Sequence, residues 1–205
     1  MPIIQTPPAM LSYPALLVPR KNKFRPEDAP TYGCTLVFPV GADLKELSAA
    51  AREALDAKFG KDEVTKMLKA SPPKLRLPFR EDAEKYDPEK YKFYIQISSK
   101  DKPGLVDRYA GADGKPAPLD TSKLYPGCFV KAVLSVYAYE NSGNRGVNFG
   151  LQHIQWWADG TRLDNRIEAA DAFNAETRPE ADLTSLTEAS TKAEPGAALN
   201  DLLAG

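Results

Sequence analysis

Alternation of hydrophobic and polar positions predicts a series of β-strands along this chain. Successive residues of a strand face opposite sides of a sheet, so an alternating run marks a strand with one buried face. Pro and Gly punctuate these runs and mark the turns. We predict strands over residues 10–18, 32–38, 92–98 and 104–109, and a long hairpin of residues 128–139 and 146–157 around the turn Asn141-Ser142-Gly143-Asn144.

One stretch has the helical period instead, with hydrophobic residues recurring every three or four positions. These residues are Leu44, Leu47, Ala51, Leu55 and Phe59. They predict a helix that is capped by Asp43 and ends at Gly60, with a shorter helical piece over residues 62–70. Residues 74–91 are charged and irregular, and we expect a solvated insertion there.

The first strand of the hairpin carries different chemistry on its two faces. Its even-numbered positions, from Cys128 to Ala138, are small or aliphatic and are expected in the core. The odd-numbered positions are Phe129, Lys131, Val133, Ser135, Tyr137 and Tyr139. The partner strand changes parity along its length, so we expect a β-bulge near Gly150 or Gln152. The sequence leaves open which of Trp156 and Trp157 faces outward.

Aromatic rings beside cations are what single-stranded nucleic acid requires of a binding surface. Each base stacks on a ring for about 1–3 kcal/mol, and Lys and Arg neutralise phosphates whatever the base sequence. Outward tyrosines also pack against cross-strand neighbours in ordinary sheets. The residue pattern alone leaves both interpretations open.

The charge of the chain is unevenly distributed, although its net charge is only −1. Residues 1–166 hold 25 Lys and Arg against 20 Asp and Glu, whereas residues 167–205 hold 2 against 8. A basic body with an acidic tail suits a protein that attracts a polyanion and carries a segment that competes with it. An acidic disordered tail that only keeps the protein soluble is the alternative.

These elements predict a mainly β protein, an OB-fold (oligonucleotide-binding) five-stranded barrel with an inserted helix and a long C-terminal hairpin. We predict a binding domain over residues 1–173 and a disordered, acidic, flexible tail over residues 174–205. Uncovered edge strands would also allow a homodimer. The predicted nucleic-acid-binding residues are Arg20, Lys21, Lys23, Phe24, Arg25, Lys92, Tyr94, Lys100, Lys102, Arg108, Phe129, Lys131, Tyr137, Tyr139, Arg145, Trp156 and Trp157.

The chemistry of an enzyme is not evident in the sequence. The single histidine, His153, has no recognisable Ser or Cys nucleophile to activate as a general base. The sequence also contains no phosphate-binding loop motif. Cys34 and Cys128 are expected as small buried residues, so we predict no metal site and no cofactor. No segment approaches the roughly 20 apolar residues of a membrane span, and the start of the chain lacks a signal-peptide pattern. We therefore expect a cytoplasmic protein without a membrane partner.

Several short segments are distinctive. They are Ser12-Tyr13-Pro14, Ser98 to Arg108, Leu124 to Val130, Tyr137-Ala138-Tyr139, Gly143 to Val147, Gly150-Leu151-Gln152, Asp159-Gly160 and Ala170 to Phe173. Together they resemble a family of tailed-phage proteins that bind single-stranded DNA through an OB fold, over most of residues 10–173.

The resemblance implies a role in phage DNA replication or recombination, in which the protein coats exposed strands in the cytoplasm of the infected bacterium. It also implies that the tail contacts replication or recombination proteins and restrains DNA binding. Such tails commonly end in acidic residues with a terminal aromatic, whereas this chain ends Asp201-Leu202-Leu203-Ala204-Gly205. The alternatives are a metal-dependent nuclease, built from loop carboxylates such as Asp101 and Asp107, and a structural phage protein without affinity for nucleic acid.

Overall fold

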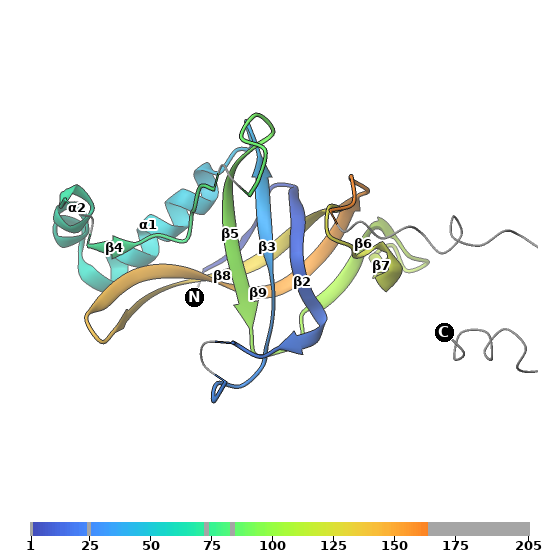
Figure 1. The fold of residues 1–205 in the computed structure, drawn as a ribbon, viewed down its shortest axis with the longest axis horizontal. Coiled ribbons are helices and arrows are strands. Elements are labelled where there is room, and N and C mark those ends of the chain that lie inside the picture. Colours follow the sequence, from blue (N-terminus) through green and yellow to red (C-terminus); the bar gives the residue numbers. More distant parts are fainter. Residues whose placement is uncertain (1, 24–25, 72–73, 83–84, 164–205) are drawn as a thin grey trace, which may run out of the picture. The chain divides into compact units, whose positions relative to one another are not determined.

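The computed structural model describes residues 2–23, 26–71, 74–82 and 85–163, which belong to one compact unit (Figure 1). The predicted tail and the domain boundary at residue 173 lie outside the described residues. The elements, in chain order, are β1 (Ile3–Gln5), β2 (Ala9–Arg20), β3 (Thr31–Pro39), α1 (Lys45–Phe59), α2 (Lys61–Lys69), β4 (Leu75–Arg76), β5 (Tyr91–Ser99), β6 (Gly104–Ala110), β7 (Pro116–Pro118), the 3₁₀ helix η1 (Thr121–Lys123), β8 (Phe129–Asn141) and β9 (Asn144–Ala158).

Every predicted strand and both predicted helices are present, within a few residues of their expected ends. The three unpredicted strands, β1, β4 and β7, are only two or three residues long, too short to show a period. The predicted N-cap of α1 was one residue early, because Leu44 occupies that position. The carboxylate of Asp43 still accepts a hydrogen bond from the Lys45 backbone N–H, at 3.0 Å.

Five strands close into the predicted barrel. β2 pairs antiparallel with β3, β3 with β5, and the hairpin strands β8 and β9 with each other. β8 also pairs with β2, and β5 meets β9 in parallel at Ser98 and Gly150, which closes the ring. Figure 1 shows β2, β3 and β5 side by side in front of the long β8–β9 hairpin. Their outward face therefore forms one side of the barrel.

The core of the barrel is built from the alternating positions that the sequence marks. On β8 the even positions from Val130 to Val136 are buried, as predicted, and the odd positions are half-buried. Leu36, Ile95 and Phe149 fill the interior from the neighbouring strands, and α1 adds Leu47 and Leu55. Burial of this much apolar surface is the main source of stability of such a domain.

The predicted bulge of β9 is confirmed. Val133 pairs with His153 but Leu134 pairs with Leu151, so Gln152 is the extra residue. A second register shift, between Phe129 and Val130, leaves Trp157 without a partner.

The same shift decides which tryptophan faces outward. Trp156 enters the core with 7% of its surface exposed, whereas Trp157 points outward and is half-buried.

The solvated insertion predicted at residues 74–91 is in fact partly packed. Leu75 is buried in the core, and the Phe79 ring meets the Phe149 ring edge-on, with centroids 5.8 Å apart. Tyr86 lies on the outward face of the sheet, 5.6 Å from the Tyr94 ring. These contacts leave no periodic pattern in the local sequence, because each is made with a strand that is distant in the sequence.

Both cysteines are buried as free thiols, as predicted, and burial raises the pKa of each. No helix among the described residues is long and apolar enough to cross a membrane.

Candidate nucleic-acid interface

The outward face of β2, β3 and β5 is organised in cross-strand rows. Met10, Val37 and Tyr94 form a hydrophobic row, against which Phe129 packs from β8. The next row is polar, with Ser12, Thr35 and Gln96 paired across the three strands. The Tyr86 side chain covers the hydrophobic row and its hydroxyl lies 3.2 Å from the Ser12 hydroxyl. The Tyr86 side chain does not cover the rest of this outward face.

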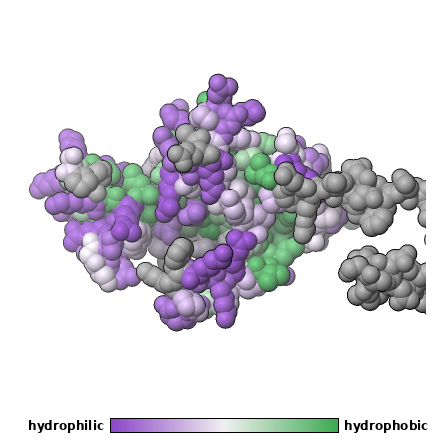
Figure 2. Space-filling view, viewed as in Figure 1, coloured by the Kyte–Doolittle hydropathy of each residue, from purple (hydrophilic) through white to green (hydrophobic). Residues whose placement is uncertain are grey.

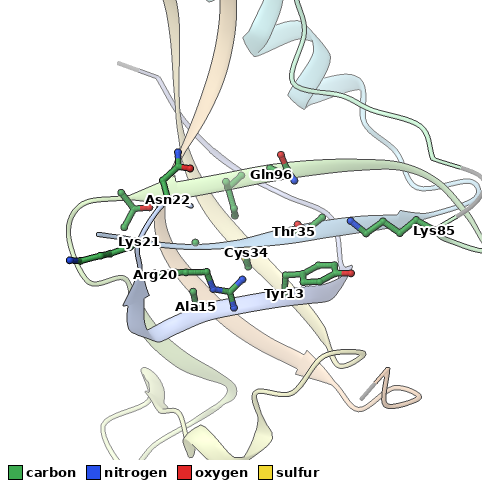
Figure 3. A pocket seen from close by; sticks show the side chains of 12 residues that line it. Tyr13, Ala15, Arg20, Lys21, Asn22, Cys34, Thr35, Lys85 and Gln96 are labelled. Atoms are coloured by element: carbon green, nitrogen blue, oxygen red, sulfur yellow. The ribbon is translucent and has the colours of Figure 1, made fainter. Parts of the chain in front are cut away.

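A hollow occupies this open part, between the end of β2, the loop that follows it and β5. It is lined by Tyr13, Ala15, Arg20, Lys21, Asn22, Thr31, Gly33, Cys34, Thr35, Lys85, Gln96 and Ile97. Figure 3 shows Arg20 reaching across the hollow, with Tyr13 and Lys85 together at one end. Figure 2 shows hydrophilic residues over the middle of this face and a hydrophobic patch beside the end of β2, where Leu17 and Val18 are exposed.

A second hollow adjoins the first on the other side of β5. It is lined by Arg76, Leu77, Pro78, Arg80, Gln96, Ile97, Ser98, Tyr139, Val147 and Asn148. The two hollows share Gln96 and Ile97 and so adjoin at β5, and we treat the pair as one surface. We call it the strand-face groove. It runs from the β2–β3 loop to the arm of the β8–β9 hairpin.

The strand-face groove is strongly basic. Its cations are Arg20, Lys21, Arg76, Arg80 and Lys85, and no Asp or Glu is among the described residues that line it. None of these five side chains forms an ion pair with a carboxylate in the part of the chain that the structure describes. Uncompensated cations in a depression concentrate a positive potential there, which attracts a polyanion.

Two tyrosines give the groove its aromatic surfaces. Tyr13 is 54% exposed and sits at a register shift in β2, with the left-handed backbone φ of 49°. The Lys85 ammonium is 4.5 Å from the centre of its ring, and 5.5 and 5.8 Å from those of Tyr86 and Tyr94. At the other end of the groove Tyr139 is half-buried beside Asn148.

Three of the predicted residues, Arg20, Lys21 and Tyr139, line the groove. Lys23 is exposed in the loop after β2, whereas Phe24 and Arg25 lie outside the described residues. Lys92, Lys100 and Lys102 are exposed but line neither hollow.

Four predicted residues are engaged in packing or pairing. Tyr94 faces outward as predicted, but Tyr86 covers its ring, and Phe129 packs on the same hydrophobic row. Arg145 is held by Glu140 at 2.8 Å and by Glu63 at 3.9 Å. Trp156 is in the core.

The rest of the predicted set lies on the outward face of β6, β8 and β9. Tyr137 accepts a hydrogen bond from the Asn148 amide at 3.4 Å. Arg108, Lys131 and Trp157 form a separate cluster, described below.

Sequence reasoning missed Tyr13, Arg76, Arg80 and Lys85. Three of them belong to the segment that was expected to be solvated, and only its folding against the sheet brings them to the groove. Tyr13 carried a usable signal, since an aromatic residue directly before a proline in the middle of a strand indicates an irregular, outward position.

Comparison with known proteins places the chain in a family. The family model described as Enterobacter phage Enc34, ssDNA-binding protein, matches residues 2–184. A protein named p50, from Acyrthosiphon pisum secondary endosymbiont phage 1, is 26% identical over 155 residues, which cover 73% of this chain and 80% of that protein.

Two solved structures share the fold. The single-stranded DNA-binding protein of bacteriophage Enc34 in complex with ssDNA has a TM-score of 0.58 at 19% identity, covering 79% of this chain and 89% of that one. The single-stranded DNA-binding protein gp2.5 of bacteriophage T7 has a TM-score of 0.50 at 14% identity, covering 82% and 98%. Since the family model spans nearly the whole sequence, this chain belongs to the Enc34 family of phage ssDNA-binding proteins, which are not enzymes.

Proposed function

We propose that this protein binds single-stranded DNA of any sequence in the strand-face groove, during phage DNA replication or recombination in the host cytoplasm. The observation that carries the proposal is the groove itself, whose described lining holds five cations and two tyrosines and no carboxylate, and whose cations form no ion pair within the described residues. The family membership supports the same ligand.

The chemistry of the groove divides between phosphates and bases. Arg20, Lys21 and Lys85 at one end, and Arg76 and Arg80 at the other, are placed to neutralise phosphates. Tyr13 and Tyr139 offer ring faces on which bases stack whatever their identity. Gln96 lies between the two ends, and its amide can donate to or accept from any base. These contacts favour binding without sequence preference.

The acidic residues of the segment 174–205 enter the proposal through their charge. A mostly negative segment tethered to a basic groove raises the local concentration of a competitor for DNA. We assign that segment the restraint of DNA binding and the contact with replication or recombination proteins.

A metal-dependent nuclease would need several carboxylate, histidine or cysteine side chains converging on one point. In the described ranges, no three such side chains gather in a group that could hold a metal ion. Asp107, one of the carboxylates considered for this role, was expected in a loop but lies within β6, where it forms an ion pair with Lys123 at 2.7 Å. The geometry thus favours binding over cleavage.

The test is a titration of a fluorescein-labelled oligothymidylate, followed by anisotropy at low and at moderate salt. We expect saturable binding that weakens as salt rises, because phosphate contacts release counterions. The variant Arg76→Ala/Arg80→Ala should weaken binding at low salt by about tenfold. Its control, Lys61→Ala/Lys69→Ala, removes the same charge from exposed positions of α2 and should bind like the wild type.

Two outcomes would contradict the proposal. Absence of saturable binding at low salt would leave a structural phage protein without nucleic-acid affinity. Shortening of the oligonucleotide only when magnesium is added would indicate the nuclease instead.

A further inference from the structure

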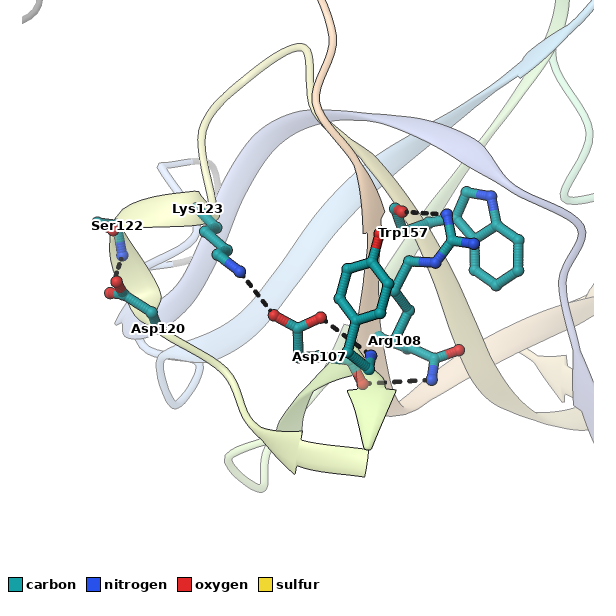
Figure 4. A network of polar contacts seen from close by, with 8 residues as sticks. Asp107, Arg108, Asp120, Ser122, Lys123 and Trp157 are labelled. Carbon is teal, nitrogen blue, oxygen red and sulfur yellow. Dashed lines mark hydrogen bonds and ion pairs between the residues drawn. The ribbon is translucent and has the colours of Figure 1, made fainter. Parts of the chain in front are cut away.

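A second group of aromatic and cationic side chains lies apart from the strand-face groove, on the outward face of β6, β8 and β9. It consists of Arg108, Tyr109, Lys131 and Trp157, which we call the Trp157 patch. Figure 4 shows the Arg108 guanidinium beside the Trp157 indole. None of these residues lines either hollow of the groove.

The sheet itself presents Trp157. The register shift at Phe129 and Val130 leaves Trp157 unpaired on β9, and its neighbour Trp156 occupies the inward position. Bulges of this kind redirect a side chain out of the regular alternation. The backbone therefore holds the Trp157 ring at the surface, although a large and mostly apolar side chain is usually buried in the core.

Two cations flank the ring. The Arg108 guanidinium carbon is 4.2 Å from the centre of the Trp157 ring, and the Lys131 ammonium is 3.9 Å from it. Arg108 also donates a hydrogen bond to the Trp157 carbonyl at 3.0 Å, which fixes its position. Tyr109, 61% exposed, lies beside Arg108, with the guanidinium 5.2 Å from its ring centre.

Within the described part of the chain, no acidic side chain balances the charge of these cations. Neither Arg108 nor Lys131 forms an ion pair with a carboxylate of the described residues. The acidic residues closest in sequence are engaged elsewhere, since Asp107 pairs with Lys123 and Asp159 accepts a hydrogen bond from the Tyr125 hydroxyl. Two cations packed on one ring repel each other, so this arrangement contributes little to the stability of the fold. A bound anion would relieve the repulsion.

The surface between the groove and the patch also favours a nucleic-acid strand. Between Tyr139 and Lys131 the outward positions of β8 are Val133, Ser135 and Tyr137, and none of them or of their partners on β9, which are His153, Gly150 and Asn148, is a carboxylate. Eight residues of strand span about 26 Å. A short oligonucleotide held in the groove would not reach the patch, whereas a longer one would.

We propose that the Trp157 patch is a second contact for single-stranded DNA, used by strands long enough to leave the strand-face groove and continue around the barrel. The inference rests on the proposed function. Phosphates bind Arg108 and Lys131, and a base stacks on the face of Trp157 from which Lys131 moves. Lys131 can move because its ammonium forms no hydrogen bond or ion pair with the described residues and only lies over the ring, whereas Arg108 is anchored.

The experiment uses Trp157 as its own reporter. The chain has two tryptophans, so Trp156→Phe leaves Trp157 as the only one. An oligothymidylate of about 6 nucleotides lies near the lower end of the range of sites that one OB fold occupies, and one of about 20 nucleotides exceeds that range. Both should bind, as followed by anisotropy, but only the long one should quench the Trp157 emission. In the wild-type background, Trp157→Phe should lose that quenching, which covers the case in which Trp156→Phe does not fold.

Affinity provides the second measurement. Arg108→Ala/Lys131→Ala should weaken binding of the long oligonucleotide by about tenfold and leave the short one unchanged. The control is again Lys61→Ala/Lys69→Ala, with an equal loss of charge.

The outcomes separate this inference from the proposed function. If neither oligonucleotide binds the wild type, the proposed function has failed. If both bind but the double variant holds the long one as tightly as the wild type, or Trp157 is not quenched, the patch is not a DNA contact. Quenching by polyglutamate but not by the long oligonucleotide would assign the patch to an acidic protein segment and would overturn the inference.

Discussion

At the scale of the residue, Tyr13 combines backbone strain with an exposed ring. A left-handed φ costs a residue with a Cβ about 1–2 kcal/mol relative to glycine, and the exposed ring recovers little of this through burial. Strain of this kind persists where the surrounding structure uses the side chain that it presents. In this groove the presented side chain is a stacking surface beside Lys85.

Replacement of Tyr13 therefore separates stability from binding. Tyr13→Gly and Tyr13→Ala should both lose one stacked base, which is worth about 1–3 kcal/mol of DNA affinity. The glycine variant should be the more stable of the two by about 1 kcal/mol, because only glycine adopts this backbone freely. Urea unfolding and oligonucleotide titration of the two variants check this. Wild-type affinity in the glycine variant would show that the ring does not touch DNA.

At the scale of the element, one ion pair ties β6 to η1. The Lys123 ammonium donates to the Asp107 carboxylate, whose side chain is 11% exposed. This bond lowers the pKa of Asp107 and raises that of Lys123. The Lys123 ammonium also lies 4.7 Å from the centre of the Trp156 ring. The Asp107–Lys123 ion pair therefore lies between the solvent and the end of β9 that enters the core.

The direction of these pKa shifts predicts a dependence of stability on pH. A carboxyl with a lowered pKa stabilises the fold above its unfolded pKa of about 3.9, and this contribution disappears as the pH falls through the folded value. Asp107→Asn should therefore lower the melting temperature by about 2–4 °C at pH 7. The difference from the wild type should shrink below about pH 4. Thermal unfolding measured from pH 2 to pH 8 tests this.

The exposed Asp28 provides the control for that series, because Asp28→Asn removes the same charge from a loop. If the melting temperature of Asp107→Asn is still lower than that of the wild type by the same amount at pH 2, Asp107 acts through packing and not through its charge.

At the scale of the whole molecule, the groove joins segments from four parts of the chain. The cations of all these segments contribute to the attraction of the groove for DNA. If its five cations each neutralise one phosphate, the logarithm of the binding constant should fall with the logarithm of salt concentration with a slope of about −3.5. Arg20→Ala/Lys21→Ala should reduce the steepness of this slope by about 1.4.

The measurement is a series of titrations across salt concentrations, with Lys61→Ala/Lys69→Ala as the variant of equal charge. An equal change of slope in both variants would mean that net charge, and not the groove, determines the salt dependence.

Much of the architecture could be predicted because its signals are local. The alternation along β8 identified its buried face, and the change of parity along β9 predicted a bulge near Gly150 or Gln152, which the structure has at Gln152. The shortest strands and the packing of residues 74–91 could not be predicted, since they depend on partners far away in the sequence. The same reason explains why Tyr94 was expected to be open when Tyr86 in fact covers it.

The sequence by itself determined the longer strands, the helices, the buried face of β8, and the supply of cations and aromatics, because each depends on neighbours a few positions away. The tertiary structure alone decided which of those residues meet. The register of β2, β3 and β5 and the folding of residues 74–91 onto that sheet place Tyr13, Lys85 and Arg80 in one groove. A one-residue shift at Phe129 puts Trp157, and not Trp156, at the surface, because strand pairing fixes side-chain direction and pairing is a long-range contact.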